Sequence, residues 1–258
     1  NARMHKFMLE QQKFEQQLEA ARIIQESFLP QGAPTDNRNR FRVAGKGIAA
    51  RSIGGDFYDY IEFDENTLGM VMGDVAGKGI PAALYMARLV SDFRFQTQIE
   101  RDPERILSTI NNLLVERSRR GMFVTLQYLL LDTPTGLMQI ASAGHLPMIR
   151  IDHRGERCNF INGESSAPLG IIKNMAFTCQ TVRLEPGDIL VCFTDGIIEA
   201  KNKKGKQYTM ERLKRFLRNA WESPDQIVED VIASVNEFAH GVAQHDDLTV
   251  TALQWVKH

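Results

Sequence analysis

The sequence has no long hydrophobic run and very few cysteines. No segment approaches the roughly 18 consecutive apolar residues that cross a membrane, and no signal peptide is recognisable. Cys158, Cys179 and Cys192 are odd in number and lack metal-ligand spacing, which is typical of a reducing compartment. We therefore expect a cytoplasmic protein with no membrane span in this chain.

The sequence also lacks an excess of either charge. Its 31 Lys and Arg residues nearly balance 32 Asp and Glu residues, so a surface that attracts nucleic acid is not indicated. At 258 residues and 43% hydrophobic content, one large domain with an appendage is the default expectation. The chain begins with Asn1 inside a helical pattern, so we expect it to be a piece of a longer protein.

The familiar phosphate-binding loops are absent from the most glycine-rich stretch, Leu68–Arg88, with the sequence LGMVMGDVAGKGIPAALYMAR. A Walker loop needs four residues between its first Gly and Gly-Lys, whereas three separate Gly73 from Gly77-Lys78. A dinucleotide fingerprint should lead through its helix to a second strand, whereas another helical pattern follows here. Asp74, at the end of an apolar strand, is equally consistent with a helix cap and with a ligand.

Residues 1–30 are predicted to form a separate helix that ends at Pro30. Apolar residues and two glutamines recur at steps of three and four, as in a weak coiled coil. The seam comprises Met4, Phe7, Gln11, Phe14, Leu18, Ala21, Gln25 and Phe28. We expect a linker or dimerisation helix that carries a signal, with a helix packed on its own domain as the alternative. Residues 31–258 then form the main domain.

A β-hairpin is predicted around the turn Asp64-Glu65-Asn66, between GDFYDYIEF and TLGMVMGDVA. If the hairpin closes symmetrically about Glu65, Asp56 faces Asp74 across the strands. Their Cβ atoms would then lie about 4.5–5.5 Å apart. Two carboxylates at that range repel each other by about 1–4 kcal/mol, so this register favours a bound cation.

The rest of the chain does not alternate regularly between strands and helices. Helical patterns cover Pro81–Gln98, a segment from Asp102 to about Arg120, Thr209–Asn219 and Pro224–His240. Strand patterns fall in two hairpin-rich blocks before and between these helices, and a last strand follows Asp247. This order predicts an α+β fold of antiparallel sheets covered by helices.

Four acidic sites share one pattern, an Asp at a strand end or turn beside Gly or another Asp. They are Asp56, Asp74, Asp195 and the pair Asp246-Asp247. All-oxygen ligands select hard cations such as Mg²⁺ or Mn²⁺ over zinc. Two such ions could hold a bridging water, lower its pKa and orient it at phosphorus. Any one of these residues alone is more often a cap, but the four sites together favour the metal interpretation.

Six ordered motifs carry a resemblance to a known family. They are RSIGGDFYD (51–59), GDVAGKGIPAAL (73–84), ASAGHLP (141–147), PLG (168–170), FTDGIIEA (193–200) and DDLTV (246–250). The sequence resembles the metal-dependent PPM, or protein phosphatase 2C-like, phosphatases and is similar to their bacterial SpoIIE/RsbU branch.

The resemblance implies a four-layer αββα sandwich of two antiparallel sheets and a site for two Mn²⁺ or Mg²⁺ ions. It implies hydrolysis of phosphoserine or phosphothreonine on a protein, often a small anti-sigma-factor antagonist. The N-terminal helix would link an upstream sensor or receiver to the catalytic domain, and its seam predicts a homodimer. The implied catalytic ligands are Asp56, Asp74, Asp195 and Asp246, with the Val75 carbonyl as a further ligand and Asp247 as the alternative to Asp246.

Two expected catalytic roles, the general acid and the phosphate-binding residue, cannot be assigned to a particular residue of this sequence. Eukaryotic-type members place a His after Asp-Gly, whereas Val75 and Ala76 occupy that stretch, so the general acid is unassigned and water could serve. Arg51 is a weak candidate for binding phosphate. His145 is expected to be a hydrogen-bonded turn residue rather than a neighbour of the metals. Lys78 is equally consistent with a phosphate contact and with a solvated turn residue.

Two alternative functions remain. Arg51-x-x-Gly54-Gly55-Asp56 resembles the GGDEF signature of diguanylate cyclases, but Phe57 stands where that signature requires Glu. A signalling adaptor or pseudophosphatase would keep the fold and the helix without turnover. Metal-dependent turnover would separate the enzyme from the adaptor.

Overall fold

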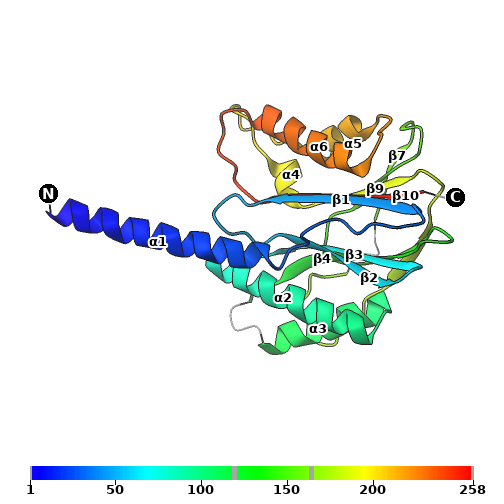
Figure 1. Cartoon of the computed structure of the whole chain (residues 1–258), viewed down its shortest axis with the longest axis horizontal. Helices are drawn as coiled ribbons and strands as arrows, with labels where there is room; N and C mark the ends of the chain where they lie inside the picture. Colours follow the sequence, from blue (N-terminus) through cyan, green and yellow to red (C-terminus); the bar gives the residue numbers. More distant parts are fainter. Residues whose placement is uncertain (1, 118–120, 163–165, 257–258) are drawn as a thin grey trace.

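The computed structural model of the chain describes residues 2–117, 121–162 and 166–256 (Figure 1). The helices are α1 (Ala2–Glu26), α2 (Ile80–Ile99), α3 (Pro103–Arg117), α4 (Asp195–Glu199), α5 (Met210–Leu217) and α6 (Pro224–Ala239). The strands are β1 (Phe41–Ile48), β2 (Phe57–Asp64), β3 (Thr67–Val75), β4 (Val124–Asp132), β5 (Leu137–Ala143), β6 (Met148–Ile151), β7 (Cys158–Ile161), β8 (Cys179–Arg183), β9 (Ile189–Phe193) and β10 (Leu248–Trp255).

The strands form two five-stranded sheets with the orders β1-β10-β9-β6-β7 and β2-β3-β4-β5-β8. Every pairing within them is antiparallel. Figure 1 shows α4, α5 and α6 over the first sheet and α2 and α3 under the second. The predicted αββα sandwich is therefore confirmed.

Three separate apolar cores explain why the four layers stay together. Between the sheets lie fully buried side chains such as Met70, Met72 and Leu190. Phe57 and Val71 point the other way and pack against α2 and α3, because neighbouring residues of a strand face opposite sides of its sheet. Strands in the middle of the sandwich are covered on both faces, and all five residues of β9 are accordingly buried.

The predicted register of the β2–β3 hairpin is observed. Phe57 pairs with Gly73, and the pairing stays symmetrical about Glu65 up to Glu62, where a bulge shifts it near the turn. The Val75 amide donates to the Gly55 carbonyl at 3.4 Å, which continues the ladder past the end of β2. Asp56 and Asp74 therefore lie opposite each other at one end of the sandwich.

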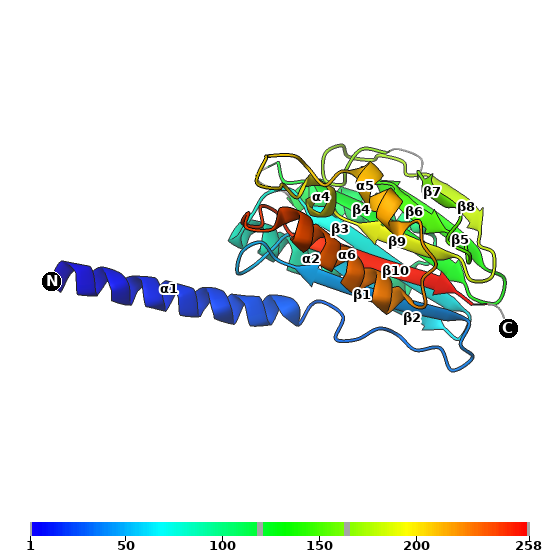
Figure 2. The same cartoon turned by 90° about the horizontal axis from the view of Figure 1, so that it is seen from above.

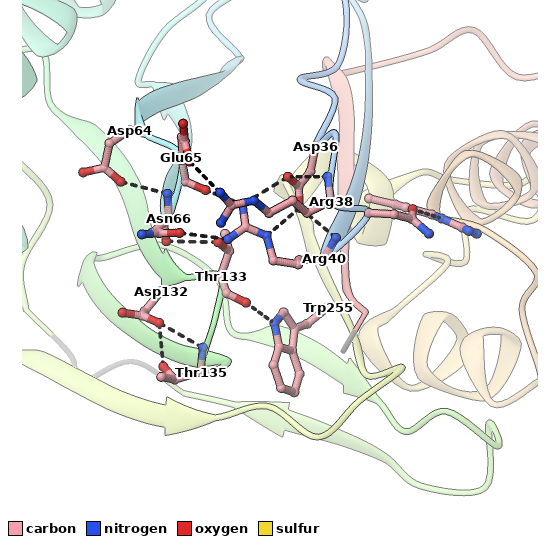
Figure 3. Close-up of polar contacts among 12 residues, drawn as sticks. Asp36, Arg38, Arg40, Asp64, Glu65, Asn66, Asp132, Thr133, Thr135 and Trp255 are labelled. Carbon is pink, nitrogen blue, oxygen red and sulfur yellow. Dashed lines mark hydrogen bonds and ion pairs between the residues drawn. The ribbon is translucent and has the colours of Figure 1, made fainter. Parts of the chain in front are cut away.

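At the other end of the same strands, charged groups are paired with one another (Figure 3). The Arg40 guanidinium contacts the Asp36 carboxylate at 2.9 Å, with their side chains 11% and 7% exposed. Arg40 also donates to the Asn66 side chain, and the Asn66 carbonyl accepts from Thr133. The Trp255 indole donates to the Thr133 carbonyl at 2.8 Å. This far-end network joins the segment before β1, both hairpin turns of the second sheet and the end of β10.

Helix α1 projects from the sandwich, with its N-terminal end far from the other elements (Figures 1 and 2). In its outer half the seam residues Met4, Phe7 and Phe14 are exposed, whereas from Leu18 onward the seam is half-buried. The inner half of α1 therefore packs on its own domain, as the alternative interpretation expects, and the outer half presents an exposed apolar seam. No described helix has the length and apolar character needed to span a membrane.

Two details of the secondary structure differ from the sequence expectation. The short helix α4 was not predicted, because Gly196 and two isoleucines favour a strand over a helix by local propensity. The helix expected to reach Arg120 is described as far as Arg117, and residues 118–120 lie outside the described residues.

Candidate metal centre

Asp56 and Asp74 form the buried centre of the acidic cluster. Burial and the charge of Asp74 raise the pKa of Asp56 well above its usual range. The Asp56 carboxylate accepts hydrogen bonds from the Thr194 and Thr249 hydroxyls, each at 2.7 Å. Burial and the charge of Asp195 raise the pKa of Asp74 to about 6, although a hydrogen bond with the Asp56 carboxyl acts in the opposite direction. The two carboxyl groups therefore share one buried site in which their charged forms are disfavoured.

Asp195 and Asp246 approach this pair from the other sheet. Asp195 is the first residue of α4, directly after β9, and Asp246 precedes β10, the neighbour of β9. Burial and the charge of Asp246 raise the pKa of Asp195. The antiparallel pairing of β9 with β10 thus brings together two residues that are far apart in the sequence.

Asp247 has a different position from its neighbour. Its carboxylate accepts from the Ala50 amide and from the Gly55 amide, both at 2.8 Å, and so holds the loop before Asp56. A Cβ on Gly54 would lie 2.1 Å from an Asp247 carboxylate oxygen, and one on Gly196 would lie 1.9 Å from the Asp247 carbonyl oxygen. The GGD and DG motifs therefore need glycine at these two positions, because the loop before Asp56 and the start of α4 both pack directly against Asp247.

The Val75 carbonyl also faces this loop. A Cβ on Gly55 would lie 2.8 Å from the Val75 oxygen and 3.5 Å from an Asp74 carboxylate oxygen. The Val75 carbonyl oxygen and an Asp74 carboxylate oxygen therefore both lie beside Gly55.

The donor set fits a hard divalent cation by its chemistry. Five carboxylates from four sites gather at one end of the sandwich, and in the described part of the chain Lys78 makes the only ion pair to any of them. Burying like charges without a counter-ion is costly, which is why several of their pKa values are raised.

The carboxylates do not form a closed ligand shell as they stand. Within residues 2–117, 121–162 and 166–256, no three His, Cys, Asp or Glu side chains lie close enough together to hold a metal ion. Each carboxylate is instead held by another partner, such as the two threonines at Asp56, Lys78 at Asp246 and backbone amides at Asp247. The donor chemistry fits the metal, and the contact that competes for a proposed ligand is that of Lys78 with Asp246, whereas the hydroxyls and amides hold Asp56 and Asp247 in place.

Three candidates from the sequence have clear positions. The His145 imidazole contacts the Thr125 hydroxyl at 2.9 Å, and burial lowers the pKa of His145 to about 4, so it is the hydrogen-bonded turn residue that we expected. Arg51 lines a cavity of about 310 Å³ together with Asp56. Lys78 is an exposed loop residue whose ammonium group contacts the Asp246 carboxylate.

Other contacts of the site could not be assigned from the sequence. The Gln25 side chain on α1 donates to the Gly54 carbonyl at 2.6 Å and accepts from the Gly54 amide at 3.2 Å. Thr194 and Thr249 lie within the FTDG and DDLT motifs. Their places beside the acidic residues of these motifs could have indicated that they belong to the site. Gln25 gave no such signal, because its partner is 29 positions away.

Comparison with known proteins places the chain in a family. The family model described as stage II sporulation protein E (SpoIIE) matches residues 64–256, which is most of the chain and begins after the GGDFYD motif. The phosphoserine phosphatase RsbU of Bacillus subtilis is 24% identical over 244 residues, covering 95% of this chain and 71% of RsbU. The chain spans less than half the length of two other curated relatives, at 41% and 45%.

Solved structures share the fold. The SiaA-PP2C domain of Pseudomonas aeruginosa has a TM-score of 0.81 at 21% identity, covering 95% of this chain and 98% of that one. RsbX, solved in complex with magnesium, has a TM-score of 0.64 at 18% identity, covering 87% and 100%. From the family match, the chain belongs to the SpoIIE family.

Proposed function

We propose that residues 31–258 form the catalytic domain of a metal-dependent protein serine/threonine phosphatase. One observation carries the proposal, namely that Asp56, Asp74, Asp195 and Asp246 from both sheets gather around a single end of the sandwich. Sequences selected only for stability do not bury like charges together, because the arrangement costs free energy that a cation would recover.

Two divalent ions, Mn²⁺ or Mg²⁺, would be held by these four aspartates, with the Val75 carbonyl as a further ligand. When bound, such ions lower the pKa of a water between them and neutralise charge on phosphoryl oxygens. The crystallisation of RsbX with magnesium supports a divalent cation in this fold. Asp246 is proposed as the ligand over Asp247, because both Asp247 carboxylate oxygens already accept backbone amides.

The chain's own residues position these ligands. The Thr194 and Thr249 hydroxyls fix the Asp56 carboxylate, and the Thr249 amide donates to the Thr194 hydroxyl at 3.1 Å, so both threonines are themselves held. Asp247 fixes the loop that carries Gly55 and Asp56. Partners of this kind typically contribute a tenfold to hundredfold effect on metal affinity.

The substrate that we propose is a phosphoserine or phosphothreonine on a bacterial signalling protein, specifically a small anti-sigma-factor antagonist in the cytoplasm. RsbU, which is similar over 95% of this chain, is a phosphoserine phosphatase. The diguanylate cyclase alternative is set aside, since the chain belongs to a different family.

A metal-dependent assay tests the proposal. Purified protein with Mn²⁺ is expected to release phosphate from p-nitrophenyl phosphate and from a phosphoserine protein. Asp74→Asn is expected to lower the rate at least roughly 100-fold, because it removes a ligand oxygen's charge from the centre. Folding of the variant is checked by circular dichroism. A folded wild-type protein that binds Mn²⁺ without turnover would favour the adaptor alternative.

We also propose that residues 1–30 form a dimerisation helix that passes a signal from an upstream sensor or receiver. The exposed seam at Met4, Phe7 and Phe14 offers an apolar face for a second copy of α1. The inner end of α1 reaches the centre through Gln25, which binds both backbone groups of Gly54, two residues before Asp56. The Phe28 carbonyl accepts from Arg94, which also binds Asp59.

Two substitutions separate these contacts. Phe7→Glu is expected to convert a dimer to a monomer in analytical ultracentrifugation, because it places a charge in the exposed seam. Gln25→Leu is expected to leave the dimer intact and to change the Mn²⁺-dependent rate severalfold, because it frees the Gly54 loop. Unchanged mass in the first variant and an unchanged rate in the second would refute the signalling role.

A further inference from the structure

Lys78 occupies an unusual place in the acidic cluster. Its ammonium group lies 2.8 Å from an Asp246 carboxylate oxygen and donates to the His245 carbonyl at 2.9 Å. Its charge also opposes the rise in the pKa of Asp195. Lys78 therefore supplies a single positive charge to a group of five aspartates.

The loop that carries Lys78 has open space around its two glycines. Gly77 and Gly79 flank it with φ angles of 111° and 74°, and no atom lies within 4 Å of the place where either Cβ would be. Lys78 and Asp246 are also both partly exposed, at 38% and 35% for their side chains. An ion pair with this exposure is weak, so a doubly charged ion can replace it at modest cost.

We propose that Lys78 is a tethered counter-ion that competes with the divalent cation for Asp246. The inference rests on the proposed function only in taking Asp246 as a metal ligand. In the metal-free protein Lys78 neutralises part of the cluster and holds the segment before β10. The incoming ion displaces it from Asp246, so this contact sets the metal concentration at which the centre fills.

The test is Mn²⁺ binding by isothermal titration calorimetry, without substrate. Lys78→Gln is expected to lower the dissociation constant of the Asp246 site for Mn²⁺ roughly three- to tenfold, because the competitor is gone. Lys201→Gln is the matched control. Lys201 lines the same neighbouring cavity as Asp246 but forms no ion pair in the described part of the chain, so its loss is expected to leave the constant unchanged.

A double-mutant cycle separates direct competition from a long-range effect of charge. In an Asp246→Asn background, Lys78→Gln is expected to keep only the small effect of its charge on Asp195 and to lose most of its effect on the Mn²⁺ affinity. The proposal is overturned if Lys78→Gln leaves the wild-type constant unchanged, if Lys201→Gln changes it equally, or if the full effect persists without Asp246. These outcomes are independent of phosphatase activity, so an inactive enzyme would count against the proposed function alone.

Discussion

Carboxyl groups at the two ends of the sandwich have pKa values shifted in opposite directions. At the far-end network, the Asp36 carboxylate is paired with Arg40, which lowers the pKa of Asp36 to about 2. At the acidic end, neighbouring carboxylates and burial raise the pKa of Asp74 to about 6. The same strands connect both ends, since β2 and β3 run from one to the other. The fold is therefore stabilised at one end and strained electrostatically at the other.

This difference between paired and unpaired charges indicates which end of the sandwich is the binding centre. Paired charges need no further partner and contribute to closing the sandwich, whereas like charges held together by two sheets need a cation to become favourable. Raised carboxylate pKa values in a cluster thus indicate a binding centre more reliably than the presence of acidic residues alone.

The largest expected effect on stability comes from breaking the far-end network. Arg40→Met leaves Asp36 without its partner in a site that is mostly removed from water. We expect the free energy of unfolding to fall by roughly 2–3 kcal/mol, measured by urea denaturation. Arg38→Gln is the control, because Arg38 and its partner Glu65 are 60% and 79% exposed and such pairs contribute about 0.2–1 kcal/mol or less. Equal losses in the two variants would contradict the comparison.

At the acidic end a substitution is expected to stabilise the metal-free protein. In the folded state the pKa of Asp74 is about 6, which is above its value in the unfolded chain. The ionised side chain therefore destabilises the folded state increasingly as the pH rises from about 4 to 6, and by a constant amount above pH 6. Asp74→Asn is therefore expected to raise the free energy of unfolding by about 1–3 kcal/mol at pH 7 and by little at pH 4.

Asp64→Asn, near the other end of the hairpin, is the control of opposite sign. Arg101 lowers the pKa of Asp64, so its stabilising contribution is present at neutral pH and is lost as the pH falls. A metal-free Asp74→Asn variant that is less stable than the wild type at pH 7 would show that the acidic end is not strained.

A smaller effect is expected from the hydroxyls that hold Asp56. Thr249→Val removes one hydrogen bond at nearly constant volume, and we expect the Mn²⁺ affinity to fall about tenfold in calorimetry. Thr251→Val, at an equally buried threonine on the same strand, is the control and is expected to leave the affinity unchanged. Equal affinities in both variants would show that Thr249 has no positioning role.

Local patterns were sufficient to predict much of the fold. The symmetrical register about Glu65 placed Asp56 opposite Asp74, because a hairpin's turn determines every pairing along its strands. The helical patterns that begin at Asp102 and Pro224 placed the starts of α3 and α6 to within one residue. The family motifs then implied the order of layers that the structure has.

The contacts that the sequence did not indicate join residues that are distant along the chain. Lys78 reaches Asp246 across 168 positions, and Thr249 reaches Asp56 across 193. Nothing in the local pattern around Lys78 identifies its partner. Helix α4 was missed for a related reason, since Gly196 is required there by contact with the Asp247 backbone rather than by helix propensity.

The continuity of α1 has a consequence for the proposed dimerisation seam. Its outer seam and Gln25 belong to one uninterrupted helix from Ala2 to Glu26, so they turn together. Each residue of an α-helix adds about 100° of rotation and 1.5 Å of rise. An insertion of seven residues between them would nearly restore the angular phase, whereas one of two or five would aim the seam away from its former direction. Helical phase, more than distance, would then determine whether a movement upstream is felt at Gly54.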